Sequence, residues 1–214
     1  MLFIFDWDGT LSDSTAKITT AMQLAAGDLG WPVLADHKIH NIIGLGLPEA
    51  MATLYPERDP SEYLHLREAY AGRFLALDEA RPSDFFPGVL DTLARLQDHG
   101  HTLTIATGKS RKGLDRILGM LGVADLFVST RCADETASKP HPLMLEQLLQ
   151  EFGVAPNDAV MVGDTEYDME MARLINMPRI AVSYGAHHVD RLRIYEPDLC
   201  MDHFSQILAW PRLG

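Results

Sequence analysis

The sequence predicts an α/β fold, in which a Rossmann-like, doubly wound parallel sheet carries a helical subdomain inserted after its first strand. From about residue 86 onward, strand-length apolar runs alternate with amphipathic stretches of helix length. This alternation is typical of parallel strands joined by right-handed crossovers. Residues 15–80 break it with a mainly helical stretch. We therefore expect a core formed by residues 1–14 and 81–214 and a helical insertion formed by residues 15–80.

The first element is a short apolar run, Leu2 to Phe5, which predicts a buried strand. The insertion then shows apolar residues at helical spacing, and prolines separate its segments. Four helices are expected there, around Ile18–Ala25, Ile39–Ile43, Leu47–Leu54 and Tyr63–Leu77.

The second part of the chain supplies the remaining strands and their crossover helices. Strands are predicted at Thr102–Thr107, Leu126–Ser129, Ala159–Val162 and Arg179–Ser183. Helices are predicted at Pro87–Gly100, Ser110–Leu121, Pro142–Phe152 and Thr165–Ile175, with a short closing helix at Phe204–Trp210. In such a sheet the functional site is expected at the carboxyl ends of the strands.

Composition and charge narrow the class of function. The 214 residues carry a formal net charge of -12, and the pI is about 5.1. Nucleic acids and anionic membranes attract Lys and Arg, so neither is an expected partner. Only two cysteines are present, Cys132 and Cys200, without CxxC spacing. This usage fits a reducing compartment, and the sequence shows no signal peptide or membrane-spanning run. We expect a cytoplasmic protein, monomeric or homodimeric.

Two carboxylates directly follow the first strand and are the most informative feature of the chain. Asp6 and Asp8 lie two residues apart, and the turn signal Gly9-Thr10 follows them. Carboxylates at the end of a buried strand are costly unless they bind a metal or take part in chemistry. The alternative, that both merely cap a turn, fits poorly with two acids beside an apolar run.

Further polar residues stand at the other predicted strand ends and loops. Thr107-Gly108 ends the second strand, and Lys139 opens a Lys-Pro-His-Pro segment before a helix. Asp164 ends the fourth predicted strand after Gly163, and Asp168 follows about one helical turn later. Taken alone, a Thr-Gly pair is often only a turn and a lone lysine is usually a surface residue. Lys109, next to Gly108, is expected to be solvated.

Together these segments resemble the haloacid dehalogenase-like (HAD) phosphatases. The run from Asp6 to Ser14 matches the motif Asp-x-Asp-Gly-Thr-[Leu/Val]-x-Asp-Ser at every defining position, and Gly163 to Asp168 matches Gly-Asp-[Ser/Thr]-x-x-Asp. The four motifs follow the family's order, and the resemblance covers the whole chain. It is closest to the phosphoglycolate phosphatase-like group, whose helical cap stands where residues 15–80 stand here.

The resemblance implies an Mg²⁺-dependent phosphomonoester hydrolase acting on a small phosphorylated metabolite through an aspartyl phosphate. It makes Asp6 the nucleophile and Asp8 the general acid and base, and the presence of Asp8 favours phosphoryl transfer over dehalogenation. By the same resemblance, the Thr107 hydroxyl and the Gly108 N–H bind the phosphate oxygens. Lys139 neutralises the negative charge of the nucleophile and of the phosphoryl group.

The implied Mg²⁺ ligands are Asp6, the Asp8 backbone carbonyl and Asp164. Oxygen ligands of this kind suit Mg²⁺. Asp168 would hold a water on the metal or orient Lys139. An acid at a helix N-terminus, stabilised by the helix dipole, is an equally good interpretation of Asp168.

The inserted subdomain would select the substrate. The loop from Gly44 to Glu49 resembles the specificity loop of the family's cap, so Gly44 and Leu45 are expected to contact the leaving group. The loop is apolar and has no Arg, which weighs against a sugar-phosphate mutase because a mutase needs a second phosphate site. Lys38, Arg67 and Arg73 are more simply surface residues. A phosphomutase of the same fold and a low-turnover regulatory protein that binds a phosphate ligand stay open as alternatives.

Overall fold

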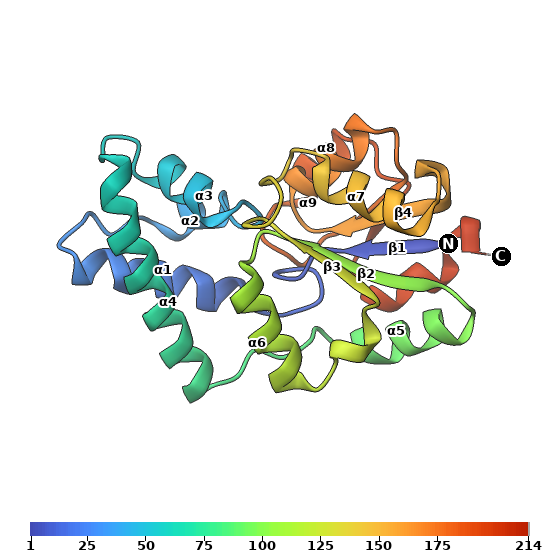
Figure 1. Ribbon diagram of the computed structural model, residues 1–214, viewed down its shortest axis with the longest axis horizontal. Coiled ribbons are helices and arrows are strands. Elements are labelled where there is room, and N and C mark those ends of the chain that lie inside the picture. Colours follow the sequence, from blue (N-terminus) through green and yellow to red (C-terminus); the bar gives the residue numbers. More distant parts are fainter. Residues whose placement is uncertain (214) are drawn as a thin grey trace.

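The computed structural model describes residues 1–213 as a parallel sheet with helices on both faces and a helical part beyond one end of its strands (Figure 1). The sheet has six strands in the order β3-β2-β1-β4-β5-β6, all parallel. They are β1 (Leu2–Phe5), β2 (Thr102–Thr107), β3 (Ser129–Cys132), β4 (Ala159–Gly163), β5 (Arg179–Val182) and β6 (Leu199–Met201). The predicted doubly wound α/β fold is confirmed.

The strand order reverses direction at β1, which lies between β2 and β4. In an open parallel sheet this point leaves a crevice at the carboxyl ends of the strands, where ligands bind. All four residues of β1 are buried and pair with β2 on one side and β4 on the other. The segment that carries Asp6 and Asp8 therefore leaves the sheet at the switch point.

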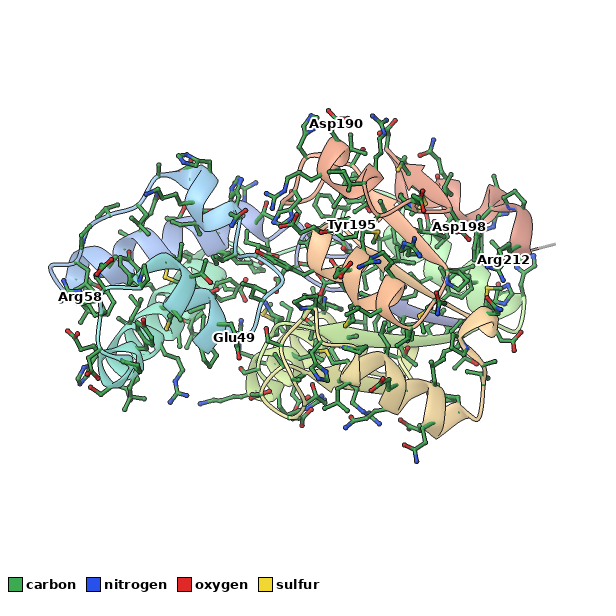
Figure 2. All side chains as sticks on the ribbon, turned by 90° about the horizontal axis from the view of Figure 1, so that it is seen from above. Glu49, Arg58, Asp190, Tyr195, Asp198 and Arg212 are labelled. Carbon is green, nitrogen blue, oxygen red and sulfur yellow. The ribbon has the colours of Figure 1, made fainter. Side chains whose placement is uncertain are left out.

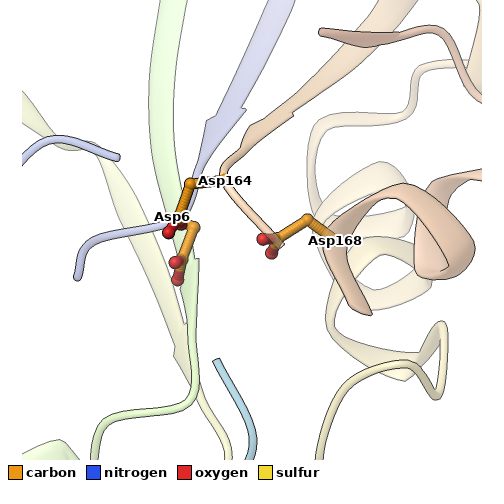
Figure 3. A group of neighbouring side chains, drawn as sticks. All are labelled: Asp6, Asp164 and Asp168. Atoms are coloured by element: carbon orange, nitrogen blue, oxygen red, sulfur yellow. The ribbon is translucent and has the colours of Figure 1, made fainter. Parts of the chain in front are cut away.

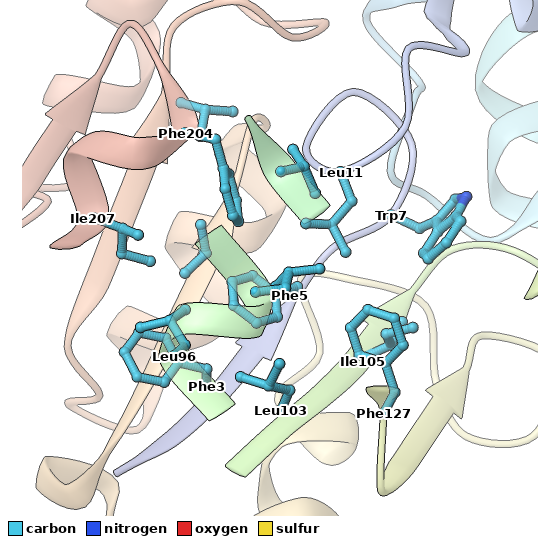
Figure 4. Packing of buried hydrophobic residues seen from close by; sticks show 14 of the residues in the cluster. Phe3, Phe5, Trp7, Leu11, Leu96, Leu103, Ile105, Phe127, Phe204 and Ile207 are labelled. Carbon is cyan, nitrogen blue, oxygen red and sulfur yellow. The ribbon is translucent and has the colours of Figure 1, made fainter. Parts of the chain in front are cut away.

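Each face of the sheet is covered by helices whose apolar side chains meet alternate residues of the strands. Phe3 and Phe5 face α5 (Val89–Asp98), α6 (Arg111–Leu121) and the 3₁₀ helix η4 (Phe204–Ala209). Figure 4 shows both rings with Leu96 of α5 and with Phe204 and Ile207 of η4. Leu2 and Ile4 face α7 (Leu143–Phe152) and α8 (Glu166–Leu174). The short helix α9 (Val189–Arg193) packs on β5. Period-two alternation along β1 thus divides the core into two layers.

Residues 15–80 form a separate group of helices at the left of Figure 1. They are α1 (Thr15–Asp28), α2 (Asp36–His40), α3 (Leu47–Leu54) and α4 (Tyr63–Ala80). They enclose a hydrophobic cluster of their own. We refer to residues 15–80 as the cap and to the rest of the chain as the core. Figure 2 shows Glu49 where this helical part approaches the sheet and Arg58 at its far end. Within residues 1–213, no helix combines the length and the apolar character that crossing a membrane requires.

Several element boundaries differ from those predicted. The predicted strand Leu126–Ser129 is displaced, because 124–126 form a 3₁₀ turn (η2) and the strand runs from Ser129 to Cys132. Three of the four residues of this edge strand are only half-buried, so they carry little apolar signal. The sequence interpretation missed β6 and α9, which are only three and five residues long. The closing helix is a 3₁₀ helix, η4. Three further 3₁₀ turns stand at Pro60–Glu62 (η1), Pro156–Asp158 (η3) and Pro211–Leu213 (η5).

Candidate active site

The strand ends bring the predicted site residues together. Asp6 follows β1, Thr107 ends β2 and Asp164 follows β4. Lys139 stands in the loop before α7, and Asp168 lies in the first turn of α8. All five are almost completely buried. Residues more than 150 positions apart in the chain therefore form one polar cluster beneath the cap.

Lys139 links two of the carboxylates. Its Nζ atom donates to Asp6 Oδ1 and to Asp168 Oδ1, each at 2.6 Å. Burial alone would lower the pKa of Lys139, but the charges of Asp168 and Asp6 outweigh it and hold that pKa above its ordinary value. Lys139 is therefore a permanent cation beside Asp6. Asp168 makes contacts that fit both interpretations of it. Its Oδ1 accepts from Lys139, and its Oδ2 accepts from the Thr165 N–H at 3.0 Å in the capping box that begins α8.

The carboxylates of Asp6, Asp164 and Asp168 converge (Figure 3), and one oxygen from each lies within 4.8 Å of the other two. Burial, reinforced by the neighbouring acids against the opposing charge of Lys139, raises the pKa of Asp6 to about 7. Burial and the charges of Asp6 and Asp168 also raise the pKa of Asp164 well above its ordinary value. Asp6 Oδ2 is buried and has no hydrogen-bond partner among the described residues. One lysine does not balance three buried acids, so this donor set fits a hard divalent cation such as Mg²⁺.

Asp164 is held rigidly by the loops around it. The Thr10 hydroxyl donates to Asp164 Oδ1 at 2.9 Å, and the Ala186 N–H donates to Oδ2 at 2.7 Å. Gly9 and Gly185 pack so closely on this carboxylate that a Cβ would lie only 2.2 Å from Asp164 Oδ2 at Gly9 and 2.3 Å from it at Gly185. Gly9 is therefore required for packing as well as for its positive φ of 83°.

Asp8 points into a different environment from that of the cluster. Its Oδ1 accepts from the Ser14 hydroxyl at 2.6 Å, and the Lys109 Nζ lies 2.9 Å from both of its oxygens. The expectation that Lys109 is merely solvated is therefore wrong. Its ammonium group also lies 5.0 Å from the centre of the Phe74 ring of α4. A signal for this contact was present, because Lys109 stands two residues beyond the end of β2.

The predicted cap loop lies directly against the core. The Gly46 N–H donates to Ser138 Oγ at 2.7 Å, one residue before Lys139. A Cβ at Gly108 would lie only 2.5 Å from the Leu45 carbonyl oxygen and 2.6 Å from that of Gly44. Only glycine permits this approach, so Gly108 is needed for the contact between cap and core. This requirement is separate from the predicted role of its N–H in binding a phosphate oxygen.

The structure separates the roles expected of Gly44 and Leu45. Both residues line the cavity between cap and core. Gly44 has φ of 99°, and a Cβ there would lie 3.0 Å from Thr165 Oγ1. A larger residue at Gly44 would therefore strain the docked loop, which makes Leu45 the better probe of substrate selection.

A buried ion cluster joins cap and core, and sequence reasoning missed it. Asp78, near the end of α4, has no exposed surface and accepts from Lys17 of α1 and, at 2.8 Å, from Arg116 of α6. The Ser83 N–H donates to the same carboxylate at 3.0 Å. These ion pairs lower the pKa of Asp78 although burial acts in the opposite direction. No motif marks this cluster, since its members are distant in sequence and each is an ordinary helix or loop residue.

Comparison with known proteins identifies the family of this chain. The sequence model of the family described as haloacid dehalogenase-like hydrolase matches residues 3–182. The chain belongs to this family. A protein of Dickeya dadantii named "Probable phosphatase IndB" is 35% identical over 97% of this chain and 92% of its own length. The phosphoglycolate phosphatase of Aliivibrio fischeri is 31% identical over 97% of this chain and 95% of its own.

The solved structures agree on the fold. A chain from Haemophilus somnus, described as a predicted phosphoglycolate phosphatase, superposes with a TM-score of 0.87 at 24% identity and covers 97% of this HAD chain and 96% of its own. At that identity the likeness speaks for the fold alone. Family membership and phosphatase relatives that match nearly the full length make this HAD chain an enzyme of the phosphatase type.

Proposed function

We propose that this HAD phosphatase is an Mg²⁺-dependent phosphomonoester hydrolase of the phosphoglycolate phosphatase-like group, which works through an aspartyl phosphate on Asp6. The observation that carries the proposal is that the two aspartates after β1 make different contacts. Asp6 is tied to Lys139 inside the acidic cluster, whereas Asp8 stands outside it with Ser14 and Lys109.

In the first step an Asp6 carboxylate oxygen forms a bond to phosphorus, and the bond from phosphorus to the leaving oxygen breaks. Lys139 keeps its positive charge throughout, so it offsets repulsion between carboxylate and phosphoryl group. The Thr107 hydroxyl and the Gly108 N–H supply hydrogen bonds without adding negative charge. Asp8 delivers its proton to the leaving oxygen, and Lys109 and Ser14 stabilise the carboxylate that remains.

In the second step water attacks phosphorus and the bond to the Asp6 oxygen breaks, which releases inorganic phosphate. Asp8, now a carboxylate, takes the proton of this water. Asp8 is therefore ready for the next ester at the end of each cycle, and the enzyme needs no further proton donor.

Asp6, Asp164 and the Asp8 backbone carbonyl would hold Mg²⁺, and Asp168 adds a carboxylate to the same cluster. The bound ion supplies positive charge that lowers the repulsion between the acids and the phosphoryl group. The orphaned Asp6 Oδ2 and the raised pKa of Asp6 are the observations that support a cation here.

A mutase is the enzymatic alternative, but the cap loop does not favour it. A mutase has to bind a second phosphate, and the loop from residue 44 to 49 contributes only apolar side chains and Glu49 to the cavity. The regulatory alternative binds a ligand without turnover. The pairing of Asp6 with Lys139 and the separate position of Asp8 beside Lys109 favour turnover instead.

The test is phosphate release from a panel of phosphomonoesters with Mg²⁺ and with excess chelator. We expect hydrolysis that chelator abolishes and added Mg²⁺ restores, and a phosphoryl group on Asp6 in acid-quenched protein analysed by peptide mass spectrometry. Full activity in chelator would contradict the metal assignment. A phosphoryl group found on another residue would contradict the covalent mechanism.

A further inference from the structure

The cavity between cap and core is large compared with a two-carbon substrate. Its volume is about 680 Å³, and it extends from Asp6 and Thr107 in the core to Leu75 on α4. Cavities of roughly 300–1,000 Å³ typically enclose ligands of drug size. A phosphoryl group and a two-carbon acid would leave most of this space empty.

The cap lines the cavity with apolar and aromatic side chains. They include Ile18, Met22, Ile42, Ile43, Tyr70 and Phe74. The rings of Tyr70 and Phe74 are tilted by 42° with centres 5.9 Å apart. Burial, with a contribution from the charge of Asp8, raises the pKa of the Tyr70 hydroxyl. The Lys109 ammonium group lies 5.0 Å from the centre of the Phe74 ring and 2.9 Å from the Asp8 carboxylate. The aromatic pair therefore stands on the side of the cavity where Asp8 would meet the leaving oxygen.

The charges around the cavity do not favour an anionic leaving group. Four cations line it, namely Arg67, Lys109, Lys112 and Arg116, against five acids, namely Asp6, Asp8, Glu49, Glu68 and Asp134. Lys109 pairs with Asp8, Arg116 pairs with Asp78, and Asp6 pairs with Lys139. The cations that are left, Arg67 and Lys112, are outnumbered by the remaining acids Glu49, Glu68 and Asp134. A carboxylate or a second phosphate would therefore lose hydration without gaining a surplus of positive charge.

We propose that the leaving alcohol of the natural substrate carries an aromatic or heteroaromatic ring, and that it has neither a carboxylate nor a second phosphate. This inference rests on the proposed phosphomonoesterase function and specifies its substrate class. The ring would lie against Tyr70 and Phe74, in the offset or edge geometry that aromatic pairs prefer. The resemblance to phosphoglycolate phosphatases then applies to the residues that act on the phosphoryl group. The leaving alcohol of this protein's substrate differs from glycolate.

The first experiment compares kcat/KM for benzyl phosphate, ethyl phosphate and phosphoglycolate with saturating Mg²⁺. Benzyl and ethyl alcohol are similar in basicity, so their esters differ mainly in the ring. We expect benzyl phosphate to be preferred over both others by roughly 10- to 200-fold, the range that small differences in apolar contact produce. Phosphoglycolate hydrolysed as well as benzyl phosphate would overturn this inference alone. Failure to hydrolyse any phosphomonoester would overturn the proposed function, and the inference with it.

A pair of variants on α4 locates the effect. Ala71 is exposed and lines the cavity, whereas Ala76 is exposed on the same helix and does not. Ala71→Trp fills space that the ring would use, so the ratio of kcat/KM for benzyl over ethyl phosphate should fall at least about tenfold. Ala76→Trp should leave the ratio unchanged. Ala71→Arg adds a further cation to the cavity wall and should raise the relative rate for phosphoglycolate. If Ala71→Trp left the ratio unchanged, or Ala76→Trp lowered it equally, the assignment of this cavity to the ring would be wrong.

Discussion

The two ends of the cavity differ in polarity: charged side chains form the core end and apolar side chains form most of the cap end. At the core end, Asp6, Lys139 and Asp168 are fixed by short charged hydrogen bonds, and two glycines pack against Asp164. At the cap end, the wall consists of aliphatic and aromatic side chains from α1, from α4 and from the loop that follows α2. Directional bonds fix atoms to a few tenths of an ångström, whereas apolar contacts tolerate changes of shape. The core end therefore suits a reaction that is the same for every ester, and the cap end suits selection among esters.

The largest expected effect comes from breaking the core end at its nucleophile. Asp6→Asn should lower kcat by roughly 10⁴- to 10⁶-fold for every ester, the scale on which loss of a nucleophile or its partners acts in other covalent enzymes. Phosphate release and the circular dichroism spectrum would be measured together. The exposed surface variant Asp125→Asn serves as control and should keep full activity. A folded Asp6→Asn protein with near-normal turnover would refute a covalent role for Asp6.

Loss of Asp8 should affect esters unequally, because Asp8 donates the proton to the leaving oxygen. Asp8→Ala should slow hydrolysis of benzyl phosphate by roughly 10²- to 10⁴-fold. The first step with 4-nitrophenyl phosphate should suffer less, since nitrophenolate leaves without a proton. The measurement is the pre-steady-state burst for each ester. Equal losses in the first step for both esters would assign Asp8 to some other task.

Mg²⁺ should change stability at the core end in a pH-dependent way. In the metal-free protein, burial raises the pKa of Asp6 from 3.8 to about 7. Between these values the folded state binds more protons than the unfolded state, so stability falls as pH rises and levels off above about 7. Mg²⁺ at 100 times its Kd adds about 2.7 kcal/mol, and more of this should appear at pH 8 than at pH 5, where protons compete. Thermal unfolding with and without Mg²⁺ tests this, and Asp6→Asn should show a flatter dependence on pH. A Mg²⁺ effect that is larger at pH 5 would contradict the cluster as the binding site.

The smallest expected effect lies at the joint between the two regions. Asp78→Ala leaves Lys17 and Arg116 without their shared acid and should lower the free energy of unfolding by about 2 kcal/mol. Urea denaturation measures the change. Asp190→Ala, which breaks the exposed pair with Arg193, is the matched control and should cost less than about 0.5 kcal/mol. Because the pKa of Asp78 is lowered, its contribution is complete above pH 3.8 and is lost as pH falls below that value. Equal losses in the free energy of unfolding for the two variants would mean that the Asp78 cluster stabilises the protein no more than an exposed ion pair does.

The same contrast explains how far the sequence could be interpreted. Asp6, Asp164 and Lys139 could be predicted because carboxylates and a lysine at strand ends or beside prolines are unusual, and the topology of a parallel sheet brings them together. Most strands and helices of the core could be predicted because their apolar periodicity is strong. The edge strand β3 was misplaced because its residues are half-buried, which weakens that periodicity.

The rest depends on how cap and core meet. The contact of Lys109 with Asp8, the approach of the Gly44 and Leu45 carbonyls to Gly108, and the Asp78 cluster all join residues from different layers. Local patterns do not record such meetings, because each residue also occurs in ordinary loops and helices. The charge balance of the cavity likewise depends on residues from both cap and core.

The central claim is that every ester passes through the same phosphorylated core, whichever alcohol the cap accepts. It is tested most directly by hydrolysing benzyl, ethyl and 4-nitrophenyl phosphate in the presence of a fixed concentration of methanol. The measured quantity is the ratio of methyl phosphate to inorganic phosphate formed from each ester. A common phosphoenzyme divides between methanol and water without memory of its donor, so we predict one ratio for all three esters. A ratio that changes with the ester would contradict the claim, because the leaving group would then still be present when phosphorus is attacked by its final acceptor.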